Sequence, residues 1–496
     1  MKARWRRIAL LLLLGAWIGM GWRQALKPLP EGTRLASPIC PQPVDAVTFI
    51  PDITAADAFG RAAVSQGIFD AVLGVVRGAH RFIVLDYGGF GGEAGEPTPQ
   101  RRIAAELTDA LLERRRAEPA LKVLFITDPS NERFGTARSP ELQRLRAAGV
   151  DVVLTDLDRL RDPNFVYSSF WRLVLRWWDR EGGPLGVDTR RLNFKASDRR
   201  LILADDGRGG LTAVVGSATP RDSESAWSNV AARLGGGALP ALLESELAVA
   251  RFSGWRGESA AFAEARIAPQ PPCAAPAADL AAAGSAAGGS DSALPEAVAR
   301  VQFLTEGAIG SELLARLDAT LRGDSVDVAM FHLAAREVVD SLLAAARRGV
   351  SVRLLLDPNE GSTSGGTSGL PNQPVAAELV ARSGGAIRVR WYRTHGERFH
   401  AAVVMIYGTQ RMWLMLGSAQ LTRRSLGDYN LVADVAVEVA LGSALTQQAQ
   451  QYFDTLWANR ASLGIEYTAD FAVFADPAQS DYWLGRLLEG SGFSTF

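Results

Sequence analysis

The sequence predicts an α/β fold made of two similar halves, preceded by an apolar segment at the N-terminus. Apolar runs of buried-strand type alternate with amphipathic helices along the chain, a pattern typical of a sheet covered by helices on both faces. A stretch rich in Ala, Pro, Gly and Ser divides the chain near its middle. Similar strand–turn–strand segments, each ending in Gly-Ser-Ala, recur on both sides of that stretch, which indicates a duplication.

Composition is that of an ordinary globular protein with a large core. The chain has 496 residues, of which 47% are hydrophobic and 22% charged. Its formal net charge of -1 gives no reason to expect a nucleic-acid partner. No pattern in the sequence specifies an oligomeric state.

Residues 1–26 form the predicted membrane segment. The basic start MKARWRR is followed by the apolar run IALLLLLGAWIGMGW, as in an export signal. The run is short for a full membrane span, and WRQALKPLP offers no small-x-small cleavage site. We therefore expect an uncleaved signal anchor that holds an exported (periplasmic or extracytoplasmic) body at the cell membrane. The alternative is a cleaved signal peptide and a secreted protein.

The first half spans residues 27–266. Its predicted strands are VTFIP from 47, RFIVLDYGGF from 81, KVLFITD from 122 and VDVVLTD from 150. Between the first two, QGIFDAVLGVVRGA places its large apolar residues on one helical stripe. The linker spans residues 267–297 and has almost no large apolar side chain, so we expect it to be flexible.

The second half spans residues 298–496 and repeats the theme. VQFLT from 301, DSVDVAMFHL from 324 and VSVRLLLDPNE from 350 are predicted strands, and SELLARLDATLRG from 311 is an amphipathic helix. Cys40 and Cys273 are too few for a disulfide framework or a zinc cluster. They either pair once in an oxidising compartment or are two unrelated thiols.

The repeated segments carry the candidate chemistry. The first half has DRRLILADDG from 198 and then VVGSATPRDSESAWSNVAARL from 214. The second half has FHAAVVMIYG from 399 and then MLGSAQLTRRSLGDYNLVADVAV from 415. In each, a polar residue precedes an apolar strand, and a second strand delivers Gly-Ser-Ala.

These segments resemble the phospholipase D superfamily, and in particular bacterial phospholipase D and cardiolipin-synthase-like proteins. The family signature is His-x-Lys-x4-Asp followed by Gly-Ser-x-Asn, once in each half. LNFKASDRRLILADDG, THGERFHAAVVMI and LLLDPNE with GLPNQPVAAEL extend the likeness. The resemblance covers the chain from about Lys27 to near the C-terminus, without the linker. It implies two α/β/α sandwich halves, related by a pseudo-two-fold axis and packed face to face around one site.

The resemblance also implies a reaction. In the family, one histidine attacks the phosphodiester phosphorus and forms a phosphohistidine, while the opposite histidine protonates the leaving alcohol and then deprotonates water or an acceptor alcohol. Lysines, serines and asparagines stabilise the charge on the equatorial oxygens. No metal or cofactor takes part.

The catalytic positions depart from this signature. Asp198 stands where the first histidine belongs, and Arg200 replaces its lysine. His400 is kept in the second copy, but Ala402 replaces its lysine. The remaining positions are the serines Ser217 and Ser418, the asparagine replacements Thr219 and Gln420, and the aspartate positions Asp205 and Tyr407.

Two interpretations follow from these departures. In an altered enzyme, Asp198 would be the nucleophile and His400 the general acid and base, with Arg200, Ser217, Ser418, Thr219 and Gln420 binding the phosphate. Alternatively, an Asp198–Arg200 ion pair fills the old phosphate site, and Tyr407 adds to the filling. A carboxylate about 4 Å from a phosphodiester anion costs roughly 1 to 4 kcal/mol, and only one cation offsets it. Electrostatics thus favour lost or strongly altered activity.

The chain has three histidines besides His400. His332 follows an apolar strand and His80 a helix, and both are interpreted as structural. His395 precedes the second motif and could line the same cleft.

DPNFVYSSFWRLVLRWWDR, residues 162–180, is a candidate membrane-surface helix. Asp162-Pro163 suits its start, and arginines alternate with a broad aromatic surface. The alternative is a helix packed over the domain with its arginines reaching outward.

The sequence thus predicts a membrane-anchored phospholipase D-like protein. Its ancestral activity is that of a phosphodiesterase or phosphatidyl transferase that acts on phospholipids through a covalent intermediate. The alternative is a non-catalytic scaffold that binds lipid or a partner, and membrane phospholipid is the expected partner in both cases.

Overall fold

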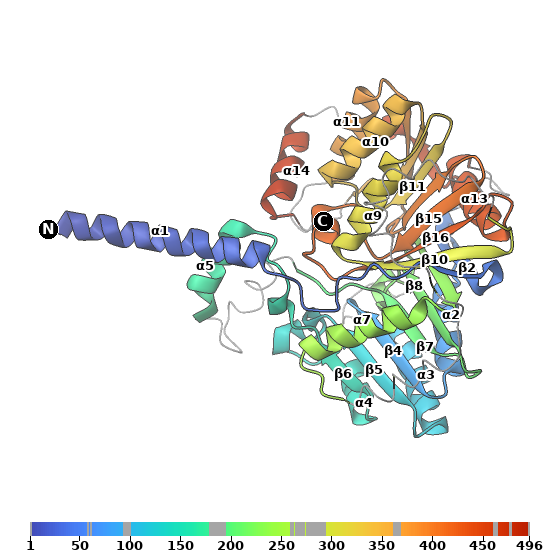
Figure 1. Cartoon of the computed structure of the whole chain (residues 1–496), viewed down its shortest axis with the longest axis horizontal. Coiled ribbons are helices and arrows are strands. Elements are labelled where there is room, and N and C mark those ends of the chain that lie inside the picture. The colour runs from blue at the N-terminus through green and yellow to red at the C-terminus, as the bar shows by residue number, and fades with distance from the viewer. Residues whose placement is uncertain are drawn as a thin grey trace.

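A computed structural model describes residues 2–56, 59, 62–92, 101–177, 195–257, 262, 273, 294–360, 369–459, 465–475 and 479–494. Most of the predicted linker at 267–297 lies outside these residues, and so do residues 178–180 of the candidate membrane-surface helix. Figure 1 shows two layered α/β halves and a long N-terminal helix that projects from one end.

The first half forms an eight-stranded sheet with the order β3-β2-β9-β8-β7-β4-β5-β6. Strands β4, β5 and β6 are parallel, and the other neighbours are antiparallel. The strands are β2 (Val47–Ala56), β3 (Ala62–Ser65), β4 (Phe82–Tyr87), β5 (Lys122–Thr127), β6 (Asp151–Leu154), β7 (Leu201–Asp205), β8 (Leu211–Gly216) and β9 (Asn229–Gly235). The helices are α2 (Ile68–Gly78), α3 (Ile103–Ala117) and α4 (Pro140–Ala147) on the outer face, and α7 (Leu239–Phe252) on the inner face.

The second half forms a nine-stranded sheet with the order β1-β10-β16-β15-β14-β11-β12-β13-β17. The strands are β1 (Cys40–Pro43), β10 (Val298–Thr305), β11 (Ser325–Met330), β12 (Ser351–Leu356), β13 (Ile387–Tyr392), β14 (Ala402–Tyr407), β15 (Arg411–Gly417), β16 (Ala433–Ala440) and β17 (Thr468–Asp470). The helices are α9 (Gly307–Asp318), α10 (Arg336–Arg348) and α11 (Asn372–Arg382) on the outer face, and α13 (Ala444–Trp457) on the inner face.

The two sheets repeat one another strand for strand. The run β2-β9-β8-β7-β4-β5-β6 has the same order and directions as β10-β16-β15-β14-β11-β12-β13. The outer helices occur at the same points of both halves. The predicted pair of α/β/α halves is therefore confirmed, and the duplication seen in the sequence is a duplication of the fold.

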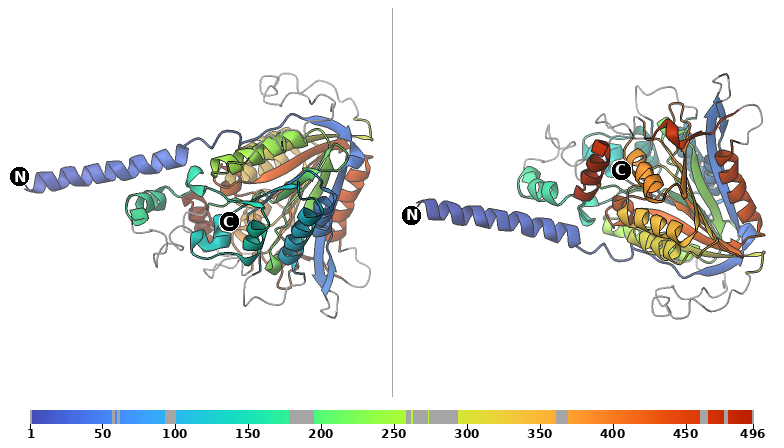
Figure 2. Two further views of the ribbon diagram at one scale, coloured as in Figure 1. Left: turned by 90° about the horizontal axis from the view of Figure 1, so that it is seen from below. Right: turned by 90° about the horizontal axis from the view of Figure 1, so that it is seen from above.

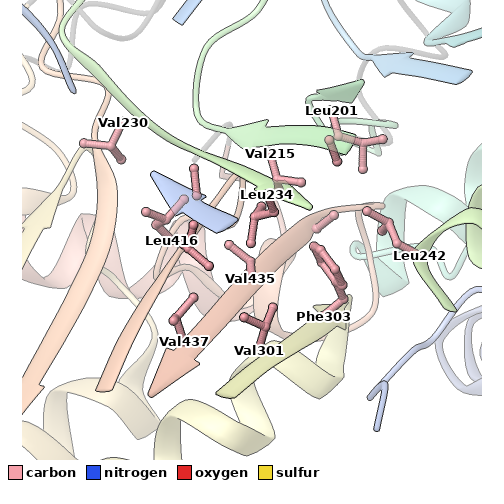
Figure 3. Packing of buried hydrophobic residues seen from close by; sticks show 14 of the residues in the cluster. Leu201, Val215, Val230, Leu234, Leu242, Val301, Phe303, Leu416, Val435 and Val437 are labelled. Carbon is pink, nitrogen blue, oxygen red and sulfur yellow. The ribbon is translucent and has the colours of Figure 1, made fainter. Parts of the chain in front are cut away.

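A single core joins the inner faces of the two sheets. Figure 3 shows Leu201 and Val215 of the first sheet facing Leu416 and Val435 of the second, with Phe303 alongside. All five side chains are at most 1% exposed. Burial of each such side chain contributes about 1.5 to 3 kcal/mol, so the halves are held as one unit. The segments that enter β7 and β14 are therefore fixed against each other.

The N-terminal arm crosses from the first half to the second. Strand β1 pairs antiparallel with β10, with Cys40 opposite Val301, so this part of the first half belongs to the second sheet. Cys40 forms a disulfide with Cys273, which lies in the connection between the halves. Of the two alternatives for the cysteines, the structure has the pair.

Three helices gather at the end from which the N-terminus projects (Figures 1 and 2). Helix α1 (Lys2–Leu26) is long and apolar enough to cross a membrane, a property that anchors and signal sequences share. Helix α5 (Phe165–Leu173) packs against it, and α14 (Gln479–Ser491) lies nearby. Asn164 caps α5, since its side chain accepts a hydrogen bond from Tyr167 N at 2.9 Å.

The arginine of α5 does not reach outward. Arg172 is buried, and its Nε donates to Asp162 at 2.7 Å, so the expectation that Arg172 snorkels into solvent or headgroups is wrong. Burial of Asp162 opposes its charge, but Lys195 and Arg172 outweigh that cost and lower the pKa of the carboxyl. The acid that was expected to begin the helix is therefore the anchor of an internal ion pair.

Candidate active site between the two halves

The segments that carry Asp198 and His400 are each pinned to the opposite half. Asp198 N donates to Leu431 O at 2.8 Å, and His400 N donates to Ser228 O at 2.8 Å. The two hydrogen bonds are equivalent under the pseudo-two-fold relation, since Leu431 and Ser228 both precede the inner strand that follows Gly-Ser-Ala. This exchange brings the two motif positions together at the interface.

Arg200 fills the space between them. Its Nε and Nη2 donate to the two carboxylate oxygens of Asp198, at 2.7 and 2.5 Å. Its Nη1 lies 2.9 Å from Nδ1 of His400 and also donates to the carbonyl oxygen of Ser217. One guanidinium thus joins the residue that replaces the first histidine to the histidine that remains.

The backbone of Arg200 is bent to make this contact. Its φ of 51° lies in the left-handed region, which costs about 1 to 2 kcal/mol for a residue with a side chain. Ala402, the equivalent residue of the second half, has no such φ. Gly88 makes room beside the pair, because a Cβ there would lie 2.9 Å from Oδ1 of Asp198. The bidentate pair offsets the strain through two charge-assisted hydrogen bonds.

The charges at the site fix the protonation of His400. Burial lowers the pKa of His400 well below its usual value, and the guanidinium of Arg200 lowers it further. Burial opposes the charge of Arg200 as well, but Asp198 outweighs that cost and the pKa of Arg200 rises. His400 is therefore neutral at neutral pH. Nδ1 of His400 also lies 3.1 Å from the carbonyl oxygen of Ser217, and its Nε2 lies 3.3 Å from Nη1 of Arg200, so both ring nitrogens already have partners within the protein.

Aromatic rings enclose the histidine. The ring centroid of His400 lies 5.1 Å from that of Trp227 and 4.7 Å from that of Phe331. The guanidinium of Arg398 lies over both rings, at 4.9 and 5.6 Å from their centroids. His400 is only 5% exposed as a result.

The two motif serines stabilise the backbone where the next strand begins. Ser217 Oγ donates to Asn229 Oδ1 at 3.0 Å and accepts from Val230 N at 3.1 Å. Ser418 Oγ accepts from Ala433 N at 3.0 Å. Both serines are at most 2% exposed. Each hydroxyl therefore supports the entry into the next strand.

The residues that replace the motif asparagines face different partners. Thr219 Oγ1 donates to Glu224 at 2.5 Å. Gln420 Oε1 accepts from His332 N at 3.0 Å, and its buried Nε2 has no hydrogen-bond partner among the described residues. Of these two replacements, only Gln420 has a buried side-chain donor without a hydrogen-bond partner among the described residues.

The remaining motif positions lie away from the site. Asp205 Oδ1 accepts from the backbone nitrogens of Arg81 and Phe82, at 2.8 and 3.0 Å, at the far end of β7. Ala402 packs in the core of the second half. Tyr407 ends β14 opposite Ser325, so it does not fill the cleft as one interpretation expected. Its hydroxyl donates to Met405 Sδ at 3.3 Å.

The second half contains two further histidines. His332, interpreted as structural, stacks its ring on Phe331 at 3.9 Å, one ring away from His400. Burial, then Arg398 and Arg424, lower the pKa of His332 to about 3. His395 lies beside Glu397, with its Nδ1 3.6 Å from the carboxylate, and is 41% exposed.

Sequence reasoning missed a buried charge cluster next to the site. Arg199 donates to Glu246 of the first half at 2.7 Å and to Glu306 of the second half at 2.9 Å, and all three side chains are fully buried. Burial raises the pKa of Glu306 to about 7, although Arg199 opposes the shift. A buried pair is costly to break, so this cluster ties the halves together behind Arg200. Its only sequence signal was a second arginine inside the motif.

Comparison with known proteins agrees with this architecture. The family described as "Cardiolipin synthase, PLD-like domain" matches residues 313–457, which include His400 and Ser418. None of the curated protein sequences compared with the chain matches it.

Solved structures extend the likeness to the whole chain. A phosphatidylserine synthase from Haemophilus influenzae Rd KW20 has a TM-score of 0.56 and 10% identity, and covers 92% of this chain and 97% of its own. A polyphosphate kinase from Porphyromonas gingivalis has a TM-score of 0.40 and 11% identity over 86% of this chain and 52% of its own. Nuc, a phospholipase D family member from Salmonella typhimurium, has a TM-score of 0.27 and 18% identity over 35% of this chain and 97% of its own. At these identities the likeness to the synthase shows a shared fold.

Proposed function

We propose that the chain is a membrane-anchored member of the phospholipase D superfamily whose phosphodiester site is closed and whose histidine-based catalysis is lost. The family match over residues 313–457 and the fold shared with the synthase support this assignment. One observation carries the proposal. Arg200 occupies the place between Asp198 and His400, where the family's mechanism needs an open phosphate site flanked by two histidines.

The contacts of His400 disfavour its use as a nucleophile. Attack on phosphorus needs a lone pair on a ring nitrogen that faces the substrate. Nδ1 of His400 lies 2.9 Å from Nη1 of Arg200 and 3.1 Å from the carbonyl oxygen of Ser217, and Nε2 lies 3.3 Å from the same Nη1, so both ring nitrogens are already engaged by the protein. The ring also lies between Trp227 and Phe331, which leaves little surface for a substrate.

The contacts of Arg200 disfavour phosphate binding. A guanidinium binds phosphate best with two parallel N–H groups. In Arg200 those groups, Nε and Nη2, already bind Asp198. A phosphodiester would have to displace a carboxylate held two residues away in the same chain. The ion pair thus acts as an internal substitute for the anion.

Phospholipid remains the proposed ligand class of the protein as a whole. The description of the matched family names cardiolipin synthase, and this name supports a phospholipid ligand. The apolar helix α1 supports an anchor, with the body on the exported side because the flanking N-terminal residues are basic. The disulfide is in keeping with an oxidising compartment. In this proposal the body is a scaffold held at the membrane.

An assay with labelled phospholipids tests the proposal. Purified full-length protein in detergent is incubated with headgroup-labelled phosphatidylglycerol, phosphatidylcholine and cardiolipin, with and without an acceptor alcohol. We expect no headgroup release or exchange above background for the wild type, and the same for His400→Ala and Asp198→Asn. Turnover that both substitutions abolish would contradict the proposal and would establish the altered enzyme, with Asp198 as nucleophile.

A further inference from the structure

The end of the body that carries α5 and α14 has exposed apolar side chains that no other described residue covers. Val166, Phe170 and Val174 lie in α5 or directly after it, and Trp483 and Leu487 lie on α14. These five side chains are between 36% and 67% exposed. A helix that is apolar on its outer face normally has a partner there.

Helix α14 has two neighbouring apolar stripes, one against the body and one exposed. Leu484 and Leu488 pack against Ala334 and Leu370 of the body. Trp483 and Leu487, four residues apart, form the outer stripe. The inner stripe suffices to hold the helix, so the outer stripe is available for another contact.

Helices α5 and α14 form one continuous surface. Gly492, just after α14, lies directly against the carbonyl oxygen of Pro163, two residues before α5. Arg423 connects them as well, since its Nη1 donates to Pro163 O at 3.2 Å and its backbone nitrogen donates to Glu489 at 2.6 Å. Figures 1 and 2 place this surface at the end from which α1 projects.

Contacts with α1 set the depth of this surface. A Cβ on Gly21 would lie 2.6 Å from the ring of Phe165, and Trp17 stacks with Phe170 at 6.0 Å. Later residues of α5 therefore meet earlier residues of α1, so α5 runs back along α1 toward its N-terminus. Any layer that surrounds α1 at Trp17 also surrounds Phe170.

Helix geometry gives the depth of Trp17 in a bilayer that α1 spans. The apolar span Arg4–Leu26 has 23 residues. At about 1.5 Å per residue it is about 35 Å long, against a hydrocarbon core of about 30 Å. The helix is therefore about 5 Å longer than the core. Trp17 precedes Leu26 by nine residues, or about 14 Å, so it lies inside the core even when the whole excess projects at the Leu26 end. Trp17 and Phe170 are therefore at hydrocarbon depth if α1 spans.

The side chains of Arg172 and Lys195 are buried beside α5, whereas Arg176, just after the helix, is 57% exposed with its Nη2 3.8 Å from Asp158. Arg172 is turned into the body, where it pairs with Asp162, and Lys195 Nζ donates to the same carboxylate at 2.6 Å. Ionisable groups at membrane depth face protein and pair in this way. Trp22, near the end of α1, and Trp483 are both well exposed, as suits tryptophan at a headgroup boundary.

We infer that α5 inserts into the bilayer beside α1 and that α14 lies on the same leaflet, so that three helices seat the body on the membrane. The inference rests on the proposed membrane anchor. It assigns the uncovered apolar surface of α5 and α14 to lipid, because α1 already brings a bilayer to that surface. The body therefore stands in a fixed orientation, and does not swing from a single helix.

Spin-label accessibility in the full-length protein tests the inference. Single cysteines replace Val174, Leu487, Leu12 and Leu321 in turn, and each is labelled with a nitroxide without reductant so that the native disulfide stays closed. The proteins are placed in phosphatidylcholine nanodiscs. Relaxation by oxygen, which concentrates in lipid, is compared with relaxation by a water-soluble nickel chelate.

We expect the oxygen-to-nickel ratio at Val174→Cys and Leu487→Cys to exceed that at Leu321→Cys several-fold, with Val174→Cys the deeper of the two. Leu12→Cys in α1 reports the anchor itself, and Leu321→Cys lies in the turn after α9. A lipid signal at Leu12→Cys with an aqueous signal at Leu487→Cys and Val174→Cys would overturn the inference and leave the anchor intact. Shielding of Leu487→Cys from both reagents would also overturn it, since a protein partner would then cover α14. An aqueous signal at Leu12→Cys would refute the anchor.

Discussion

Arg200 of the first half places Nη1 2.9 Å from Nδ1 of His400 in the second half. The donor is a permanent cation and the acceptor is a histidine whose pKa is lowered by burial and by that cation. The contact therefore helps to keep the one remaining motif histidine neutral. Together with the bidentate bond to Asp198, it joins the two motif positions in one internal network.

The Asp198–Arg200 pair should be energetically coupled. Arg200→Gln removes the partner of a carboxylate that is 24% exposed, and we expect it to lower the free energy of unfolding by about 1 to 3 kcal/mol. Asp198→Asn should cost less, because Arg200 keeps the Ser217 carbonyl as an acceptor. The double variant should be more stable than the sum of the two single losses, by about 0.5 to 3 kcal/mol. Denaturant unfolding of the four proteins measures the coupling, and strict additivity would argue against the pair.

The buried cluster around Arg199 should matter more for stability. Arg199→Met leaves Glu246 and Glu306 buried without their cation, and we expect a loss of about 3 to 5 kcal/mol. Arg347→Met on the exposed part of α10 is a control of the same chemistry. Thermal unfolding in detergent measures both. If Arg199→Met melts like the control, the cluster does not hold the halves together.

The disulfide should stabilise the crossing of the N-terminal arm. Cys40 and Cys273 are 233 residues apart, so their bond restricts the unfolded chain strongly. Removing such a bond typically costs about 2 to 5 kcal/mol. We expect dithiothreitol to lower the unfolding midpoint of the wild type but not that of the Cys40→Ala/Cys273→Ala double variant. An equal response of both proteins would show that the bond does not form.

The stability that neutral His332 contributes should be lost on acidification. The pKa of His332 is about 3 in the folded protein against 6.5 for an ordinary histidine, so the unfolded chain binds more protons between these values. Stability contributed by neutral His332 is complete above about pH 6.5 and falls below it, by up to about 1.4 kcal/mol per pH unit. Glu306, with its pKa raised to about 7, acts in the opposite sense below pH 7.

Comparison with His332→Gln isolates the histidine, because Glu306 is present in both proteins. We expect the unfolding free energy of the wild type, taken relative to that of the variant, to fall between pH 6.5 and 5. Parallel pH profiles would mean that His332 titrates normally in the folded protein.

The fold was predictable because each half carries its own pattern. Apolar runs such as RFIVLDYGGF became the fully buried strand β4, and the repeated Gly-Ser-Ala became equivalent ends of β8 and β15. Strand β1 was not predicted, since CPQP has neither alternation nor β-branched residues. It pairs because the long β10 offers an open edge and Cys40 is tied to Cys273.

The sequence predicted which residues make up the site, but it did not predict how they contact one another. The motif positions gave Asp198, Arg200 and His400, and the structure brings these three together. Spacing could not show that Arg200 adopts a left-handed backbone and reaches back to Asp198. Trp227, which packs on His400, comes from a loop whose place depends on tertiary packing, and no periodicity marks it.

The protonation state of His400 tests the account most directly. The chain has only four histidines, so nitrogen-15 resonances of labelled histidine can be assigned with single substitutions. We predict that His400 stays neutral from pH 8 to 5 and that Arg200→Gln raises its pKa, because the guanidinium is one cause of the lowering. A resonance that titrates near the ordinary value of 6.5 in the wild type would contradict the closed site and leave His400 available for catalysis.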